Sequence, residues 1–404
     1  MNTGDTAFML IATAMVMLMT PGLALFYGGL VRSKNVLSTT MQSFFCLGLI
    51  SIIWVLYGYS MAFGPDIGGF VGGMKYFGLK GVTTGIGPYS DTIPDLLFCA
   101  FQLMFAIITP ALITGAYAER MKFTAFALFT ILWATFVYFP VCHWVWGGGW
   151  LGAMGALDFA GGTVIHINSG AAALVAAIVL GKRKGYGREA MHPHNLPMTI
   201  MGAGILWFGW FGFNAGSALS AGPIAVLALF TTQVATGAAA ISWVVAEWIF
   251  QGKPTTLGAA SGAVAGLVAI TPGAGFVGPT AAILIGLVAG ALCYFAVIMK
   301  GKLGYDDALD VVGVHGVGGL WGALATGLFA STVWNPDGAN GLFFGNPHQL
   351  VVQAIGAGAA IAYSVVLTFI LLKIIDAIIG LRPDLEDEVQ GLDVTDHKEV
   401  GYSL

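Results

Sequence analysis

Residues 158–170 read DFAGGTVIHINSG, and residues 307–319 read DALDVVGVHGVGG. In both stretches the aspartate at the first position precedes a histidine, His166 or His315, by eight residues. A helix rich in small residues is expected after each histidine. A histidine inside a membrane is costly and usually faces a cavity or a partner. The repeated pattern therefore marks the two histidines as candidates for one shared site.

The composition of the whole chain is typical of a membrane protein. Of its 404 residues, 57% are hydrophobic and 9% are charged, and the mean hydropathy is +0.84. An average soluble domain has about 25% charged residues, so this chain lacks the polar surface of a water-soluble globule. This excludes soluble enzymes, nucleic-acid binders and disordered scaffolds. The 59 glycines fit membrane helices whose backbones approach closely.

Uncharged, apolar stretches that could cross a bilayer recur eleven times, since a membrane helix needs about 20 apolar residues. They are 6–31, 36–63, 96–118, 123–142, 159–181, 196–216, 222–246, 257–273, 276–299, 311–334 and 349–372. We therefore predict an all-α polytopic membrane protein with eleven transmembrane helices. The membrane domain is expected at residues 1–383, followed by a cytoplasmic tail at 384–404.

The positive charges predict the orientation of these helices. With the N-terminus outside, 14 of the 16 Lys and Arg residues fall on the cytoplasmic side, and only Lys75 and Lys80 stay outside. One missed helix would invert every later loop, so this split favours an odd number of spans. The first apolar run lacks a basic segment before it, so no cleavable signal peptide is expected. We predict a multi-pass protein of the plasma membrane with its N-terminus out and its C-terminus in.

The spacing of the polar residues indicates a duplication. GLALFYGGL at Gly22 resembles GILWFGWFG at Gly204, just as the two histidine stretches resemble each other. Gly22 precedes His166 by 144 residues, and Gly204 precedes His315 by 111. The difference of 33 fits the long, glycine-rich external loop at 64–95. The first ten spans therefore look like two copies of a five-span unit.

An odd number of spans in each copy means that the second copy lies inverted in the membrane. We predict a 5+5 inverted repeat plus one extra C-terminal helix, with the copies at about 6–181 and 196–334 and the eleventh helix at about 349–380. Inverted repeats are the architecture of many transporters, with the site near the midplane between the copies. The two histidines would then lie on either side of the midplane in one central pathway.

The polar residues also have structural interpretations. A buried histidine can simply bond to a backbone carbonyl. A metal site needs more ligands at ligand distance, and neither Glu-x-x-His nor His-x-x-x-His occurs near His166 or His315, so no metal centre is expected. Asp158 could cap the N-terminus of its helix or stabilise a cation beneath a vestibule, and both roles can coexist. The four cysteines lie in apolar runs and are expected to be buried and unpaired.

Aromatic residues cluster in the spans that flank the histidines. They are Phe101 and Phe105 in the third span, Trp146 after the fourth, and Trp210 and Phe213, with Ser217 nearby, in the sixth. Residues four apart share one face of a helix. Packing alone would explain the phenylalanines, and tryptophan is common at membrane boundaries. Taken singly, none of these residues decides the function.

Together these segments resemble the Amt/Mep/Rh ammonium transporters, the Amt branch most closely. The matching segments are DFAGGTVIHINSG, FQLMFAIITPALITGAYAER, VWGGGW, WFGWFGFNAGSAL and DDALDVVGVHGVGG, and the similarity runs across essentially the whole chain. The resemblance implies an eleven-helix protomer, a homotrimer with one pore per subunit, and ammonium as substrate. It implies neither enzymatic activity nor a cofactor, and no nucleic acid as partner.

The resemblance also implies roles for individual residues. The external ammonium site falls on Trp146, Phe105 and Ser217, the gate on Phe101 and Phe213, the pore on His166, His315 and Trp210, the acid below the entrance on Asp158, and the acid of the cytoplasmic half on Asp310. Ammonium is a small cation, which aromatic faces attract. We expect it to lose its proton near Phe105 and Asp158 and to cross as ammonia, because desolvation favours the neutral form. A proton relay along the histidines remains open.

The acidic tail at 384–404 has seven acids and one lysine, as in a docking or a disordered segment. Its GLDVTDHKEVGY resembles the family's C-terminal motif, which couples subunits and docks PII-type regulators. Lys398 and Gly401 depart from that motif. The alternative functions are an ammonium sensor that acts through this tail and a PII-type partner, a neutral-gas channel of Rh type, and a membrane enzyme using the histidines.

Overall fold

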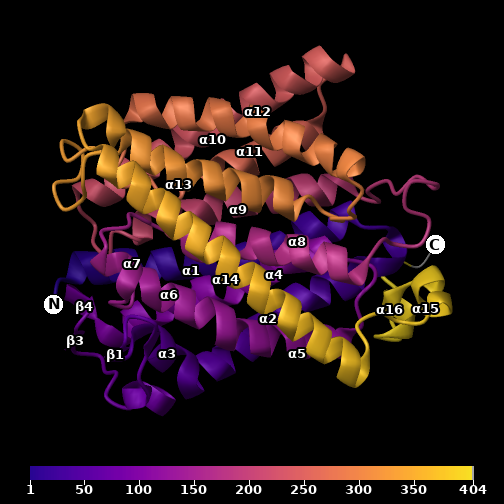
Figure 1. The fold of residues 1–404 in the computed structure, drawn as a ribbon, viewed down its shortest axis with the longest axis horizontal. Coiled ribbons are helices and arrows are strands. Elements are labelled where there is room, and N and C mark those ends of the chain that lie inside the picture. The colour runs from indigo at the N-terminus through magenta and orange to yellow at the C-terminus, as the bar shows by residue number, and fades with distance from the viewer. Residues whose placement is uncertain (403–404) are drawn as a thin grey trace.

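The computed structural model describes residues 1–402 as a bundle of long helices (Figure 1). Ten helical segments of this range are long and apolar enough to cross a membrane, and α11 is a shorter apolar helix. The segments are α1 (Thr3–Leu30), α2 with η2 and α3 (Val36–Ile53, Trp54–Gly58, Tyr59–Phe63), α4 (Asp95–Tyr117), α5 with η4 and α6 (Phe123–Trp133, Ala134–Tyr138, Phe139–Val145), α7 (Trp150–Ala153), η5 with α8 (Gly162–Ile167, Asn168–Leu180), α9 (Leu196–Gly216), α10 (Pro223–Gln251), α11 (Thr256–Ile270), α12 (Pro279–Leu303), η6 with α13 (Val312–Val317, Gly318–Phe329), α14 (Pro347–Ile379), α15 (Leu385–Gln390) and α16 (Leu392–Thr395). The predicted all-α, multi-pass fold is confirmed.

The shortest predicted span, 257–273, corresponds to α11. Its 15 residues rise about 22 Å at 1.5 Å per residue, less than the roughly 30 Å thickness of a bilayer core. Most of its residues are buried among other helices. Because protein surrounds it, α11 does not need to match the thickness of the lipid.

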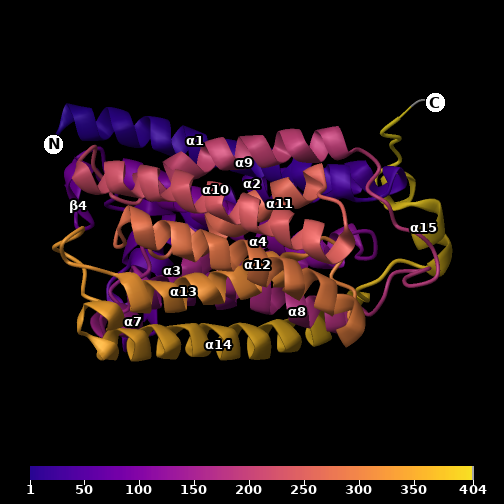
Figure 2. The ribbon, with the colours of Figure 1, turned by 90° about the horizontal axis from the view of Figure 1, so that it is seen from above.

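The two predicted copies meet where α1 and α9 lie side by side (Figure 2), the most extensive helix pair in the bundle. A Cβ atom added to Gly22 would lie 3.4 Å from the backbone nitrogen of Leu206, and one added to Gly29 would lie 2.3 Å from Oγ1 of Thr199. Residue numbers rise along one helix as they fall along the other, so the helices are antiparallel. This antiparallel pairing of corresponding helices agrees with an inverted repeat, and glycine permits the close approach.

One end of the bundle, here the hairpin end, carries the N-terminus and the loop predicted at 64–95. Within it, two small antiparallel hairpins form, β1 (Asp66–Ile67) with β2 (Val71–Gly72) and β3 (Ile86–Gly87) with β4 (Ser90–Pro94). The ring of His143 fixes the first hairpin, with Nε2 2.9 Å from Oδ1 of Asp66 and Nδ1 2.9 Å from the carbonyl oxygen of Ala62. The bond with His143 lowers the pKa of Asp66.

The opposite end, here the tail end, contains a chain of buried ion pairs between interhelical loops. Arg32 pairs with Glu119 at 2.6 Å. Arg183 donates from Nε and Nη2 to the two oxygens of Asp306, at 2.9 and 2.8 Å. Arg120, which is fully buried, donates to the backbone carbonyl of Asp306. Residues that sequence reasoning used only as markers of the cytoplasmic side therefore hold four loops together.

The acidic tail is folded against this end as far as the structure describes it. Asp393 of α16 accepts from the backbone N–H groups of Ser38 and Leu37, at 2.8 and 3.1 Å, in the first turn of α2. Asp396 accepts from the N–H of Phe123 at the start of α5. The described part of the tail is therefore ordered against the helices of its own chain.

Both departures from the family motif lie in this ordered segment. Lys398 has a φ of 56°, in the left-handed region. A Cβ atom on Gly401 would lie 2.6 Å from Cγ1 of Val36. A side chain at Gly401 would therefore require the side chain of Val36 or the tail to shift.

We expect the tail end to lose stability in acid. Burial alone would raise the pKa of Asp306, but the hydrogen bonds from Arg183 and the charge of Arg120 hold it below its ordinary value of 3.8. A pKa lowered by folding contributes stability at neutral pH that is lost as the pH falls below about 3.8. Thermal unfolding of the detergent-solubilised protein, followed from neutral pH into acid, should show this loss.

Asp306→Asn tests the origin of the effect. Removing one charge of a buried pair costs about 3–5 kcal/mol, so we expect a lower melting temperature at neutral pH and a weaker dependence on acid. Asp337→Asn, at an exposed acid of the hairpin end, should behave as the wild type. If Asp306→Asn keeps the wild-type pH dependence, the pair is not its source.

Candidate functional site

Three pockets follow one another through the core of the bundle. The first, of about 300 Å³, lies at the hairpin end and is lined by Phe105. The ring of Phe105 lies 4.3 Å, centroid to centroid, from that of Phe213, which lines the second pocket, of only about 10 Å³. The third, of about 40 Å³, shares Phe26 and His315 with the second. The pockets thus form a line from one end of the molecule towards the other.

The residues predicted for the external ammonium site lie together in the first pocket. Phe105, Trp146 and Ser217 all line it, and the rings of Phe105 and Trp146 lie 6.0 Å apart, edge to face. The indole Nε1 of Trp146 donates to the carbonyl of Asp158 at 2.8 Å, which fixes the ring. Ser217 donates its hydroxyl proton to the carbonyl of Phe213, so its lone pairs remain available to a donor in the pocket.

Aromatic rings close the bottom of this pocket. Phe101, Phe105 and Phe213 are almost fully buried. Phe105 bridges the other two, with centroid distances of 4.8 Å to Phe101 and 4.3 Å to Phe213. A Cβ atom on Gly216 would lie 2.8 Å from the ring of Phe101, so glycine makes room for that ring. The predicted gate residues therefore lie in one aromatic cluster, with Phe105 between them, edge-on to Phe101 and tilted against Phe213.

Asp158 occupies the start of η5, where its carboxylate accepts four backbone N–H bonds. Its two oxygens are 2.6 to 3.1 Å from the nitrogens of Gly161, Gly162, Thr163 and Val164. In the second copy, Oδ2 of Asp307 accepts from the N–H five residues later, as Oδ2 of Asp158 does from Thr163. The capping geometry left open by the sequence is present, and the duplication extends to this bond.

The two histidines meet in the second pocket. Nδ1 of His166 lies 3.2 Å from Nδ1 of His315, and the rings are stacked at 5.3 Å. The helical segments that carry them cross at glycines, where a Cβ atom on Gly170 would lie 2.3 Å from Cα of Gly316. On the other side, a Cβ atom on Gly319 would lie 2.8 Å from Cβ of His166. Any larger residue at this crossing would separate the histidines.

Trp210 is the third predicted pore residue in this pocket. Its ring stacks on that of His166 at 5.5 Å, and its Nε1 donates to Oγ1 of Thr271 at 2.9 Å. Thr271 orients the indole and was missed by sequence reasoning, since a threonine after an apolar helix gives no distinctive signal.

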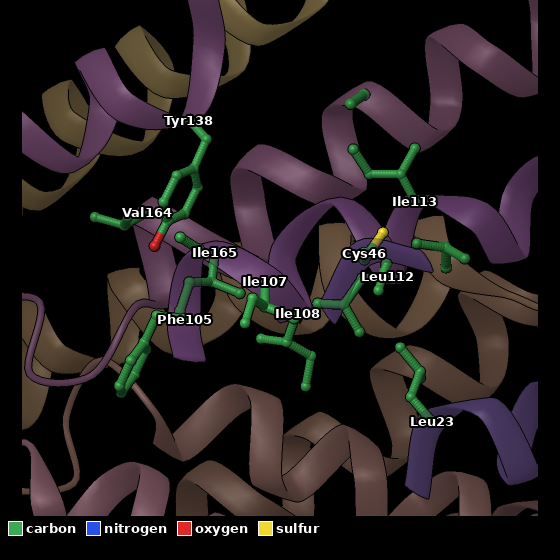
Figure 3. Packing of buried hydrophobic residues seen from close by; sticks show 14 of the residues in the cluster. Leu23, Cys46, Phe105, Ile107, Ile108, Leu112, Ile113, Tyr138, Val164 and Ile165 are labelled. Carbon is green, nitrogen blue, oxygen red and sulfur yellow. The ribbon is translucent and has the colours of Figure 1, made fainter. Parts of the chain in front are cut away.

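The walls around the histidines are apolar. Figure 3 shows Leu23 of α1, Ile108 and Leu112 of α4, and Ile165 of η5 in this part of the core, and all four line the second pocket. Apart from the histidines and Trp210, the lining carries no polar side chain. A bare ion there would find little to replace its hydration shell.

The third pocket brings Asp310 close to His315. Both line it together with Tyr27, and Asp310 forms an ion pair with Lys300 of α12. The φ of Asp310 is 66°, so the residue adopts a rarely used conformation there. Sequence reasoning placed Asp310 in this half but missed its partner Lys300 and the neighbouring Tyr27, whose hydroxyl donates to the carbonyl of Leu112 at 3.0 Å.

Asp307, the buried acid beside this pocket, was noticed only as part of the repeat. Burial, together with the charge of Asp310, raises its pKa to about 6 in spite of Lys300. Its Oδ1 has no hydrogen-bond partner among the described residues. Within residues 1–402, no three His, Cys, Asp or Glu side chains are grouped to hold a metal ion.

Comparison with known proteins identifies the family. Residues 7–402 match the Ammonium Transporter Family. The chain is 54% identical over 403 residues to the ammonium transporter of Bacillus subtilis, covering 100% of this chain and 99% of that protein. It is similar to the crystal structure of Saccharomyces cerevisiae Mep2, with 38% identity, a TM-score of 0.90 and coverage of 96% and 89%. A structure described as Sensor Amt Protein matches with 30% identity, a TM-score of 0.90 and 98% of each chain.

These matches agree with the resemblance inferred from the histidine stretches. They cover nearly the whole chain, and the family's members are transporters and not enzymes. The chain therefore belongs to the Ammonium Transporter Family.

Proposed function

We propose that this protein conducts ammonium across the plasma membrane, with the hairpin end outside and the tail end in the cytoplasm. The observation that carries the proposal is the buried histidine pair. It lies between two wider pockets, in a pocket of about 10 Å³, roughly the space that one water-sized molecule needs. The basic residues that gather at the tail end support the orientation.

The first pocket recruits the cation. The faces of Trp146 and Phe105 attract a cation, by roughly 0.5–2 kcal/mol depending on its desolvation. The lone pairs of Ser217 accept one of its N–H bonds. Potassium ions have no proton to donate, so the hydrogen bond to Ser217 favours ammonium over potassium.

At the bottom of this pocket, ammonium transfers its proton to water and becomes ammonia. Desolvation lowers the pKa of an ammonium-type cation, and the carboxylate of Asp158 stabilises the charge until it leaves. Ammonia then passes Phe101 and Phe213, whose rings must move because they fill the path. An ion that cannot shed its charge meets the apolar lining of the second pocket and is rejected.

The histidine pair supplies complementary hydrogen bonds. In a bond between two neutral imidazoles, one Nδ1 donates and the other accepts. One ring then offers Nε2 as an acceptor, and the other offers Nε2–H as a donor. Nε2 of His166 has no partner among the described residues, as expected for a group that serves a passing molecule. The same chain of bonds provides a route for separate proton transfer.

The cytoplasmic half and the assembly complete the proposal. Asp310, held by Lys300, steadies the third pocket, and Trp210 fixes the face of His166. The whole of residues 1–383 acts as the membrane domain in the lipid bilayer. The family resemblance supports a homotrimer with one pore in each subunit.

The second candidate function is an ammonium sensor that acts through the tail and a PII-type partner. Two observations favour it: the tail contacts the starts of α2 and α5, and a protein described as Sensor Amt Protein has the same fold. A sensor would change the exposure of this tail when ammonium binds.

We expect Asp158→Ala to reduce methylammonium uptake strongly in cells that lack their own transporters. The change removes a negative charge beneath the first pocket and leaves four buried N–H groups without their acceptor, each worth about 1–3 kcal/mol. Uptake should fall at least about tenfold. Asp337→Ala, which removes an exposed acid at the same end, should not change it. Wild-type uptake by folded Asp158→Ala would contradict the role of this residue.

The second prediction concerns selectivity. His166→Asp combined with His315→Glu places fixed negative charge in the second pocket, so we expect potassium to be conducted as well as ammonium. The ratio of the potassium current to the ammonium current is measured with purified protein on solid-supported membranes. His348→Asp, at an exposed histidine of the hairpin end, should retain wild-type selectivity. If the double variant also retains it, the histidine part of the mechanism is wrong.

A pull-down with a PII-type protein, with and without its nucleotide effectors, separates regulation from pure transport. If the motif around Asp393 docks such a partner, we expect nucleotide-dependent binding that Asp393→Asn weakens, because the tail then loses its hold on α2. Binding that is independent of nucleotide and of Asp393 would count against a regulated docking site.

A further inference from the structure

The first pocket contains a polar group that the mechanism above does not use. Four side chains that line it carry a polar atom: Tyr89, Gln102, Trp146 and Ser217. Three of them have partners within the chain, since Tyr89 donates to the carbonyl of Phe63 at 2.6 Å, Trp146 to that of Asp158, and Ser217 to that of Phe213. Oε1 of Gln102 has no partner among the described residues.

Gln102 is placed on the face of α4 that forms one wall of the pocket. Phe98, Gln102 and Phe105 follow one another at helical spacing, and all three line the pocket. The aromatic neighbour Phe98 is held by the stacked ring of Tyr89, at 4.9 Å. Gln102 is the amide in this otherwise aromatic wall, about one turn from Phe105.

Gln102 is the buried amide without a donor for its oxygen that lines the first pocket; Gln42, Asn168 and Asn214 share the missing donor among the described residues but lie elsewhere. Only 9% of Gln102 is exposed, and buried acceptors in folded proteins are almost always hydrogen-bonded. Rotation about the last side-chain bond exchanges its oxygen and nitrogen, so the oxygen can be turned into the pocket. Because Gln102 lines the first pocket, a molecule there that carries an N–H group can supply the missing donor.

We propose that Gln102 is a specificity-determining residue whose amide oxygen accepts an N–H bond from the cation in the first pocket. This inference rests on the proposed function and adds a second directed acceptor to it. Ser217 and Gln102 then bind two of the four N–H groups of ammonium, while the aromatic faces of Trp146 and Phe105 take the remaining charge. Methylammonium has one N–H fewer and a bulkier group, so the two acceptors favour ammonium over it.

The test is a set of dose–response currents on solid-supported membranes with purified protein, for ammonium and for methylammonium. Gln102→Leu removes the acceptor and keeps the size, so we expect the half-saturating ammonium concentration to rise about tenfold, as for a hydrogen bond to a charged group. The maximal current should change much less. The preference for ammonium over methylammonium should fall.

Gln102→Glu separates binding from structure. Glutamate keeps an acceptor and adds a negative charge, so ammonium should half-saturate at or below the wild-type concentration. If Gln102 only filled space, burying a charge there would impair the protein more than leucine does. If leucine prevents folding, Gln102→Asn serves as a second variant, because its shorter side chain withdraws the acceptor by one methylene. We expect it to raise the half-saturating ammonium concentration.

Gln42→Leu is the matched control. Gln42 is also buried and its Oε1 is also without a partner in the described chain, but it lies on α2 and not in the first pocket. It should give wild-type currents. Unchanged half-saturation in folded Gln102→Leu, or a loss of maximal current alone in both Leu and Glu variants, would overturn the inference. Absence of ammonium current from the wild type would instead overturn the proposed function.

Discussion

The contact on which the pathway depends is the crossing of two backbones at glycine. Gly170 of α8 and Gly316 of η6 leave no room for a side chain between them, so these segments approach closely enough for His166 and His315 to touch. Each histidine lies in a π-helical turn, a local widening of the helix that is frequent at functional sites. The contact between the two histidines in an apolar core thus depends on the missing side chains of Gly170 and Gly316.

Much of this architecture could be predicted from the sequence, because the signals are local. Apolar length predicted the spans, and the spacing from aspartate to histidine predicted a duplication that the bonds of Asp158 and Asp307 reproduce. Charge counting placed the loops on two sides. The family resemblance named the aromatic residues, and the structure brings those of the first pocket together.

The features that the sequence did not predict depend on contacts between distant segments. Thr271 is connected to Trp210 only in space, and Lys300 to Asp310 only across the start of the tenth span. That the oxygen of Gln102 lacks a hydrogen-bond donor is known only from the structure, which gives partners to the other polar side chains of the first pocket. The composition of the tail left a docking element and a disordered segment open, and its order comes from contacts with α2 and α5. The roles of these residues are determined by contacts with distant segments and not by their local sequence.

The bond from Asp393 to the start of α2 joins residues 355 positions apart. A helix begins with N–H groups that have no acceptor within it, and α2 obtains one from Asp393, far later in the chain. During synthesis, α2 must therefore enter the bilayer with these groups exposed to water at its end. They gain their acceptor only when residue 393 has emerged, so the start of α2 reaches its final hydrogen bonding long after the helix itself has been made.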